Sequence, residues 1–373
     1  MGFGRHTPWQ DIKRDWYGEK EQSVSPSLSL PLLELEPPTI LVRDCYVTTF
    51  DRIWAKAFQS EGKNGTILSG QPGTGKTLFL YYLLVRLLQQ KQKVLFSPDG
   101  EVLYLFNDDH VYESSTSEIK TSRHLPKSKS TSKIFLWSLF DIEEAMEPKG
   151  FLTRRPCLPV QATSPDPSQY KTWREERYPL LTALPLWTDK ELLAGLPFQD
   201  EYPALMEALQ ANTLEELDLQ LSRFSGVFEV LQEYQEDEKL LPPAQALTLL
   251  LENAIHHFGH SARDVYMGLF DYRRSLNLHK GAFHITYEKL REAVAALAHG
   301  ETPYSISDLI LSVSPAFSGA LDDVSWKVDF KSDWVAKCVD EQLGAVEDTT
   351  TYQQVDLLQG IPGAACIVGR FLS

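Results

Sequence analysis

Apolar residues recur at alternating strand and helix spacings through the first half of the chain. Positions 47–58 follow a helical period, and 78–90 is a strongly apolar helical segment. Short apolar runs between polar breaks predict strands at 66–69, 93–97, 102–106, 134–140, 158–163 and 184–187. Strands that alternate with helices favour an α/β fold with a parallel sheet.

The second half of the chain has an almost purely helical pattern. Helical segments are predicted at 201–211, 213–223, 226–236, 243–258, 261–276 and 286–299. Thr188, followed three positions later by Glu191, has the spacing of a capping box and predicts a helix start. We therefore expect a core domain at 39–198 and a helical lid or C-terminal domain at 199–345.

Three segments of different composition lie outside this pattern. Residues 1–38 mix Trp9, Trp16 and Tyr17 with charges and then become rich in Ser, Leu and Pro, which predicts a flexible N-terminal arm. Residues 114–133 form a Ser/Thr/Lys run whose basic residues outnumber its one acidic residue, which predicts a mobile insertion in the core. Residues 346–373 form a C-terminal tail.

Composition and charge narrow the class of protein. A hydrophobic content of 43% over 373 residues is that of a globular protein and excludes a wholly disordered chain. No apolar run reaches the roughly 18 residues of a transmembrane helix, and the charged N-terminus lacks the apolar stretch of a secretory signal. With four widely spaced cysteines, this favours an intracellular protein, in cytoplasm or nucleus, with free thiols and no membrane partner. The net charge of −15 disfavours nucleic-acid binding over the whole surface, so a nucleic-acid contact would be made through the local basic loop 114–133.

One motif carries specific chemistry. The segment Gly70-x-x-x-x-Gly75-Lys76-Thr77 matches the phosphate loop (Walker A motif) and lies between a predicted strand and a predicted helix. Glycines allow the chain to approach phosphate oxygens, and backbone N–H groups at the helix start bind the anion. Lys76 would neutralise the β- and γ-phosphates, and the Thr77 hydroxyl would bind Mg²⁺. The predicted nucleotide-binding residues of this loop are Gly70, Gln71, Pro72, Gly73, Thr74, Gly75, Lys76, Thr77 and Leu78.

A phosphate-loop protein also needs a carboxylate that holds the magnesium ion. Asp141 ends the apolar run 134–140 and is the first candidate; the alternative is Asp99, just after the strand 93–97. Glu143 is a candidate for the base that activates water, and its alternative is a solvated carboxylate in the first turn of a helix.

Two further polar groups are candidates for contact with the γ-phosphate. The strand 158–163 ends in Thr163 and Ser164, which could equally serve a turn before Pro165. Ser261 can cap a helix, which would leave Arg263 in its first turn, where it could reach the γ-phosphate from the helical domain. The alternative for Arg263 is a surface ion pair.

The ordered set of these segments resembles the NTPase module of the Crinkler and retrotransposon-hot-spot (RHS) proteins, especially their fungal relatives. The matching segments are 67–88, 160–165, 186–192, 259–263, 307–310 and 328–332, within a span of about 40–345. The resemblance implies an additional-strand P-loop fold related to AAA+ and STAND ATPases, with a parallel sheet flanked by helices and a helical lid. It also implies a nuclease domain after the module in many relatives. Here 363–371 resembles the start of that domain and the chain ends at Ser373, so we expect the nuclease to be missing.

These observations predict a Mg²⁺-dependent, ATP-binding NTPase that hydrolyses ATP slowly and couples hydrolysis to a conformational change between its core and its lid. The catalytic group would be Lys76, Asp141, Glu143 and Arg263. The alternative is a nucleotide-gated regulatory or interaction protein without significant turnover, with a protein partner or further copies of itself. A small-molecule kinase is disfavoured because Arg86 and Arg123 are poor candidates for its lid arginines.

Overall fold

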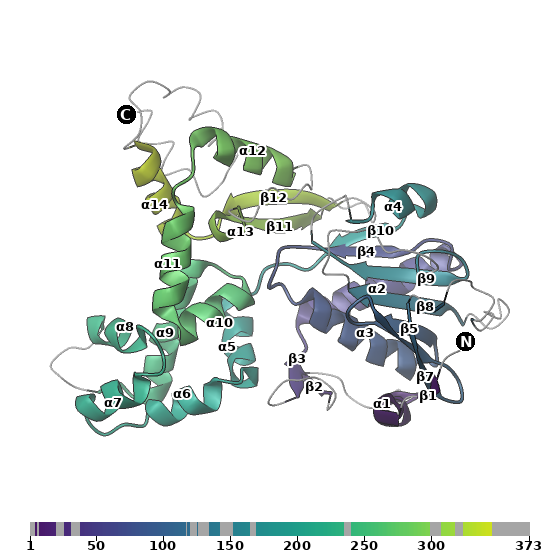
Figure 1. Ribbon diagram of the computed structural model, residues 1–373, viewed down its shortest axis with the longest axis horizontal. Helices are drawn as coiled ribbons and strands as arrows, with labels where there is room; N and C mark the ends of the chain where they lie inside the picture. Colours follow the sequence, from purple (N-terminus) through teal and green to yellow (C-terminus); the bar gives the residue numbers. More distant parts are fainter. Residues whose placement is uncertain are drawn as a thin grey trace.

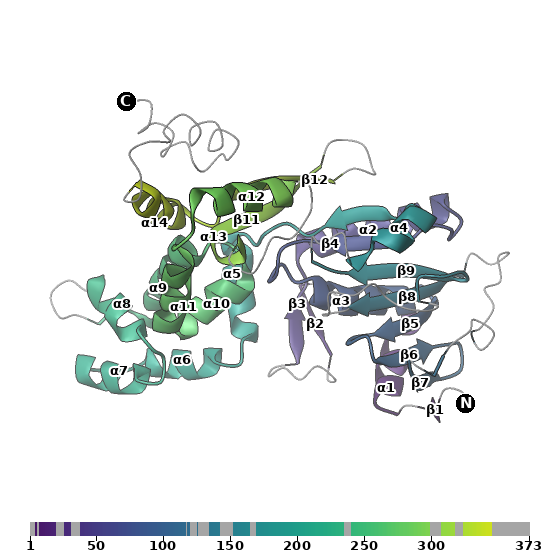
Figure 2. The same cartoon turned by 45° about the horizontal axis from the view of Figure 1, so that its top comes forward.

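The computed structural model describes most of the chain. The described residues are 4–5, 7–19, 26–30, 38–116, 118–119, 125, 134–141, 152–164, 169–234, 240–298, 307–317 and 324–344. Figure 1 shows an α/β body formed by the N-terminal half beside a mainly helical body formed by the second half, and Figure 2 shows the same arrangement from another side.

A mostly parallel sheet forms the centre of the α/β body. Its strands have the order β1-β7-β6-β5-β8-β9-β4-β10. The strands β5 (Lys93–Ser97), β8 (Leu136–Asp141), β9 (Cys157–Ala162), β4 (Thr66–Ser69) and β10 (Leu180–Ala183) pair in parallel. The strands β6 (Val102–Phe106), β7 (Val111–Ser115) and β1 (Gly4–Arg5) extend one edge in antiparallel pairs.

The strand order confirms the expected fold class. Strand β9 lies between β4, which leads into the phosphate loop, and β8, which ends in Asp141. This inserted neighbour is the additional strand of the predicted P-loop fold. The parallel strands therefore end together at one edge of the sheet, and the phosphate loop follows β4 at this edge.

Helices cover the sheet because their apolar positions face it. The helix α3 (Lys76–Gln89) is apolar almost all round, and Phe79, Leu83 and Leu87 are fully buried between α2 (Asp44–Gln59) and the strands. A smaller cluster of Ile67, Tyr170 and Trp173 packs α4 (Lys171–Arg177) against the sheet. The core thus holds α3, and with it the phosphate loop, in a fixed position.

The N-terminal residues differ from the flexible arm that composition predicts. Thr7–Trp16 forms α1, and Trp9, Ile12 and Trp16 are buried in the main core. The Trp9 ring lies 4.9 Å from that of Tyr104, between ring centroids. The spacing of these three residues places them on one helix face, so their burial outweighs the polar composition around them.

The predicted insertion at 114–133 lies largely outside the described residues. Its first two residues belong to β7. Its two aliphatic residues, Ile119 and Leu125, are buried with Leu95 and Phe140 against the sheet. Its described part is therefore attached to the core rather than mobile.

One predicted strand is displaced by four residues. Positions 180–183, rather than 184–187, form β10, because Leu180–Ala183 pairs with Thr66–Ser69 of β4. Residues 184–187 are extended chain without a ladder partner and lead to the helical body. Both segments are apolar, and only the pairing distinguishes them.

The helical body consists of short helices around its own core. They are α5 (Asp189–Gly195), α6 (Tyr202–Ala208), α7 (Leu214–Leu221), α8 (Val227–Glu233), α9 (Pro243–Phe258), α10 (Ala262–Phe270) and α11 (Tyr272–Ala282). The capping box at Thr188 and Glu191 is present at the start of α5. The predicted helix 261–276 is interrupted at Asp271, whose side chain accepts a hydrogen bond from the Arg274 amide and caps α11.

A third apolar cluster lies at the end of the described chain and also includes Ala282 and Phe283 at the end of α11. It joins α12 (Tyr287–Ala298), α13 (Ser307–Ile310), the antiparallel hairpin β11 (Leu311–Phe317) and β12 (Val324–Phe330), and α14 (Asp333–Gly344). We name residues 287–344 the C-terminal unit. In the described part of the chain, no helix is long and apolar enough to cross a membrane. The tail 346–373 lies outside the described residues.

Candidate nucleotide-binding site

The phosphate loop connects β4 to α3 through glycines that no other residue could replace easily. Gly73 and Gly75 have left-handed backbone angles, with φ of 80° and 88°. A Cβ atom on Gly73 would lie 2.9 Å from the Cβ of Arg263 and would meet the Ser261 hydroxyl. A Cβ atom on Gly75 would meet the Tyr46 hydroxyl. The loop is thus closely packed on its outer side.

Four side chains donate hydrogen bonds to the carbonyl oxygens of four consecutive loop residues. The Ser261 hydroxyl donates to Pro72 O (3.2 Å), Trp187 Nε1 to Gly73 O (3.0 Å), Arg43 Nη1 to Thr74 O (2.8 Å) and the Tyr46 hydroxyl to Gly75 O (2.7 Å). Since the C=O and the N–H of a trans peptide point in opposite directions, carbonyls held on the outer side turn the following N–H groups inward. We name Arg43, Tyr46, Trp187 and Ser261 the carbonyl clamp.

Arg43 is the central member of this clamp, and sequence reasoning missed it. Its side chain has no solvent exposure. It donates to Glu191 Oε1 at 3.0 Å and also to the carbonyl oxygens of 185 and 186, and it stacks 4.4 Å above the Trp187 ring. Its only signal in the sequence is an arginine between two apolar segments, which is too common to identify such a role.

Lys76 lies inside the loop. Its Nζ donates to Gly70 O at 2.7 Å and to Gln71 O at 3.0 Å. Burial lowers the pKa of Lys76 to about 8; the charge of Asp141 raises it, and that of Arg263 lowers it further. The ammonium is therefore buried within the loop and held there by two carbonyl oxygens.

The structure brings Asp141 to the start of α3. The Thr77 hydroxyl donates to Asp141 Oδ2 at 2.5 Å. The alternative Asp99 is occupied elsewhere, since its Oδ1 accepts from the amides of Glu101 and Val102 in the turn after β5. Glu143 lies outside the described residues.

The oxygen atoms of Thr77 and Asp141 fit magnesium, which prefers hard oxygen ligands. Among the described residues there is no group of three or more His, Cys, Asp or Glu side chains that could hold a metal ion. A magnesium site with few protein ligands and several phosphate or water ligands agrees with this pair.

Thr163 is close to the loop but engaged with another residue. It follows β9, its amide donates to Leu68 O at 3.0 Å, and it is only 2% exposed. Its hydroxyl donates to Gln169 Oε1. In this arrangement Thr163 supports the strand ends rather than presenting a free hydroxyl to the loop.

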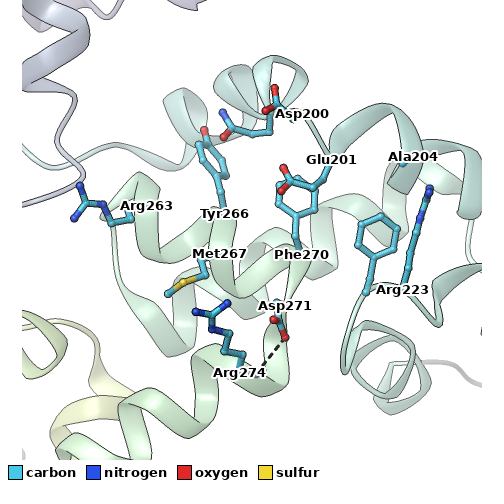
Figure 3. A pocket seen from close by; sticks show the side chains of 12 residues that line it. Asp200, Glu201, Ala204, Arg223, Arg263, Tyr266, Met267, Phe270, Asp271 and Arg274 are labelled. Atoms are coloured by element: carbon cyan, nitrogen blue, oxygen red, sulfur yellow. Dashed lines mark hydrogen bonds between the residues drawn. The ribbon is translucent and has the colours of Figure 1, made fainter. Parts of the chain in front are cut away.

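Arg263 reaches the loop from the helical body, in the first turn of α10. Ser261 does not cap α10 with its side chain, because its hydroxyl bonds Pro72 O instead. A cavity of about 730 Å³ in the helical body includes Arg263, Tyr266 and Phe270 in its lining. In Figure 3, Arg263 lies at the edge of this cavity and its side chain points away from the other labelled residues.

The C-terminal unit also contacts the loop. The Gln71 side chain is buried; its Oε1 accepts from the Val313 amide at 3.0 Å, and its Nε2 donates to Leu311 O at 3.4 Å. Gln71 was predicted as a nucleotide-binding loop residue, but its side chain is bound to β11. Burial raises the pKa of Asp308, and the charge of Asp264 raises it further, whereas the charges of Lys331, Lys76 and Arg263 lower it.

Comparison with known proteins gives weak similarity. No family model matches the chain. Over 144 residues the chain is 26% identical to Crinkler effector protein 15 and to Crinkler effector protein 16 of Phytophthora infestans, which covers 38% of this chain. The chain spans only about a fifth of the length of these curated relatives, 22% in each case.

Two solved structures are similar at low identity. One is the Aeropyrum pernix Orc1 protein in complex with DNA, with 14% identity, a TM-score of 0.26 and coverage of 80% of this chain and 92% of that one. The other is the Thermotoga maritima RuvB Holliday junction branch migration motor, with 13% identity, a TM-score of 0.31 and coverage of 72% and 84%. The fold assignment here depends on the strand order of this chain.

Proposed function

We propose that this protein is a Mg²⁺-dependent ATP-binding NTPase module whose slow hydrolysis is coupled to a movement between the α/β core and the helical body. The observation that carries the proposal is the carbonyl clamp, which fixes the phosphate loop with its carbonyl oxygens outward. Backbone N–H groups that converge on one side in this way form an anion-binding concavity. The same concavity lies at the start of α3, where the helix dipole favours negative charge.

The residues of this chain have separate tasks in the proposed site. The loop amides and Lys76 bind the phosphate chain, and Thr77 and Asp141 would hold Mg²⁺, which supplies charge neutralisation on the phosphate oxygens. Arg263 would contact the γ-phosphate from the helical body. Thr163 would take part only after its bond to Gln169 has broken.

Hydrolysis requires one more group than nucleotide binding does. It needs a group that orients or deprotonates water. Glu143 is proposed for this role because it follows Asp141 by two positions. Without such a base, the same site would bind nucleotide and switch without turnover, which is the second candidate function. The attachment of Gln71 to β11 favours that regulatory alternative, because it connects the loop to the C-terminal unit.

The similarity to the Crinkler effector proteins supports an NTPase module of the Crinkler and RHS type. We propose a fungal-type relative in which the described residues form the NTPase part.

Two measurements on the same samples test the proposal. Titration calorimetry gives the ATP affinity with and without Mg²⁺, and phosphate release gives turnover. We expect binding that Mg²⁺ strengthens and a slow release that Lys76→Ala abolishes. Tight binding with no release would select the regulatory alternative. Equal ATP affinity of Lys76→Ala and the unmodified chain would contradict the nucleotide site itself.

A further inference from the structure

A concentration of positive charge lies at the edge of the sheet opposite the phosphate loop. A cavity of about 370 Å³ is lined by Lys63, Asn64, Thr153, Arg154, Arg155, Glu176, Arg177 and Tyr178. These residues precede β4, β9 and β10, which are neighbours in the sheet. Because the three strands are parallel, their amino ends meet at one edge, and the phosphate loop follows the other end of β4. The two sites are therefore separated by the length of a strand.

The charge in this cavity is not neutralised by the described residues. Three arginines and one lysine line it, against the single carboxylate of Glu176. Lys63 pairs with Glu61 at 2.7 Å, but both side chains are mostly exposed, and such a pair is weak. Arg154 and Arg155 are exposed and form no ion pair within the described chain. In a chain of net charge −15, this local excess of cations points to an anionic ligand.

Arg177 lines the cavity and is held in place by hydrogen bonds to the backbone. Its guanidinium donates to Lys63 O at 2.6 Å, to Thr153 O at 2.8 Å and to Cys157 O at 2.8 Å. These bonds tie together the three chain segments that form the cavity. Burial lowers the pKa of Arg177, and the charge of Arg155 lowers it further. Arg177 thus adds its charge to the site, while the contacts to a ligand are left to the exposed cations.

An aromatic side chain stands at the rim of the same cavity. Tyr178 is 79% exposed, more than any other large apolar side chain of the described residues. Its backbone is left-handed, with a φ of 49°, which is unusual for a tyrosine. A solvent-exposed ring beside arginines is the combination that binds single strands, since arginines contact phosphates and the ring stacks on a base.

We propose that this cavity binds a short stretch of single-stranded nucleic acid, with Lys63, Arg154 and Arg155 on the phosphates and a base stacked on Tyr178. The cavity is at the small end of ligand sites, so it holds about one nucleotide unit and excludes a duplex, while the exposed side chains of Lys63, Arg154 and Arg155 contact the phosphates of this unit and of its neighbours along the strand. The rest of the acidic surface repels a polyanion, so the contact is local and depends strongly on salt. This proposal is independent of the nucleotide site.

The salt dependence gives a number to measure. With three phosphate contacts on a single strand, the slope of log affinity against log salt is about −2. The affinity should therefore fall roughly 20-fold between 50 and 200 mM salt. Removal of two of these contacts should reduce the slope to less than half of that value.

The experiment uses the full chain and a fluorescein-labelled oligothymidylate in an anisotropy titration. Arg154→Ala/Arg155→Ala should lose about tenfold or more in affinity. The matched control Arg274→Ala/Arg291→Ala removes the same charge from other exposed positions and should bind like the unmodified chain. An equal loss in both double variants would show a non-specific charge effect and overturn the site.

Two further comparisons test which class of ligand the cavity binds and where on the protein the oligonucleotide binds. Tyr178→Leu should weaken binding about fivefold or more, whereas Tyr178→Phe keeps a ring that stacks and should bind normally. If Tyr178→Leu is neutral and inorganic polyphosphate competes as well as the oligonucleotide, the site is a general anion site and the nucleic-acid proposal is wrong. Lys76→Ala should bind the oligonucleotide normally; a loss there would place the oligonucleotide in the phosphate loop instead. Stronger binding of a duplex would also contradict the proposal.

Discussion

Arg263→Ala should abolish most of the preference of the protein for ATP over ADP. In the structure the Cβ and the backbone of Arg263 lie beside Gly73 of the loop, and the contact proposed for its guanidinium exists only with a third phosphate. A charge-assisted hydrogen bond is worth about 1.5–3 kcal/mol, which corresponds to roughly 10- to 150-fold in affinity. The ATP affinity should fall by that factor, and the ADP affinity should change by less than about twofold.

The choice of pH matters for this comparison. The charge of Arg263 lowers the pKa of Lys76, so its removal lets Lys76 keep its proton to higher pH. Since that pKa is about 8 in the nucleotide-free protein, Lys76 is mostly protonated at pH 7 with or without Arg263. At pH 7 the unmodified protein and Arg263→Ala therefore differ in the contact made by the arginine and not in the charge of Lys76.

The assay is a set of dissociation constants for ATP and ADP, measured by titration calorimetry. Arg274→Ala is the matched control, because Arg274 lines the same cavity but comes from α11 (Figure 3). Alanine keeps the Cβ that packs near Gly73, so the loop contact survives the change. If both nucleotides lose affinity equally, Arg263 has a structural role only, and the proposed switch loses its γ-phosphate contact.

Three further predictions concern the loop and its neighbours. The ATP affinity should be nearly constant well below pH 8, begin to fall near that pH and then fall by up to about tenfold per unit, because Lys76 loses its proton before binding; Lys76→Arg should remove this fall, and a flat profile in the unmodified chain would contradict it. Asp141→Asn should reduce the gain in ATP affinity from Mg²⁺ by about tenfold, as titrations with and without the ion would show, and Asp99→Asn should not. Gln71→Ala should lower the free energy of unfolding by about 1–3 kcal/mol in urea titrations, because it leaves two buried backbone groups of β11 without partners; Gln59→Ala, at an exposed position, should be neutral.

Local signals made the centre of the site predictable. The phosphate loop is a contiguous motif, and Asp141 was a candidate because it ends an apolar run, which the structure shows to be the buried strand β8. The end of a strand and the start of the helix after the loop meet in any fold of this class, so the contact between Thr77 and Asp141 needed no long-range information.

The contacts that hold the loop were not predictable in this way. Trp187 and Ser261 reach it from residues more than a hundred positions away, and Gln71 is bound by a strand 240 positions later. A single sequence carries no pairing information at that separation. For the same reason the apolar pattern could not distinguish 184–187 from Leu180–Ala183 as the strand that pairs with β4.

The carbonyl clamp also indicates how binding at the loop could be transmitted. In the core, Arg43 directly precedes α2 and Tyr46 belongs to it. Trp187 lies in the connection to the helical body, and Ser261 directly precedes α10. Two of the four bonds that orient the loop therefore come from outside the core. A ligand that needs the inward N–H groups would bind best when all four bonds are formed, so its binding energy would stabilise the position of α10 against the loop. Because Arg263 is two residues from Ser261 on that same helix turn, the proposed coupling would act directly on the residue proposed to distinguish ATP from ADP.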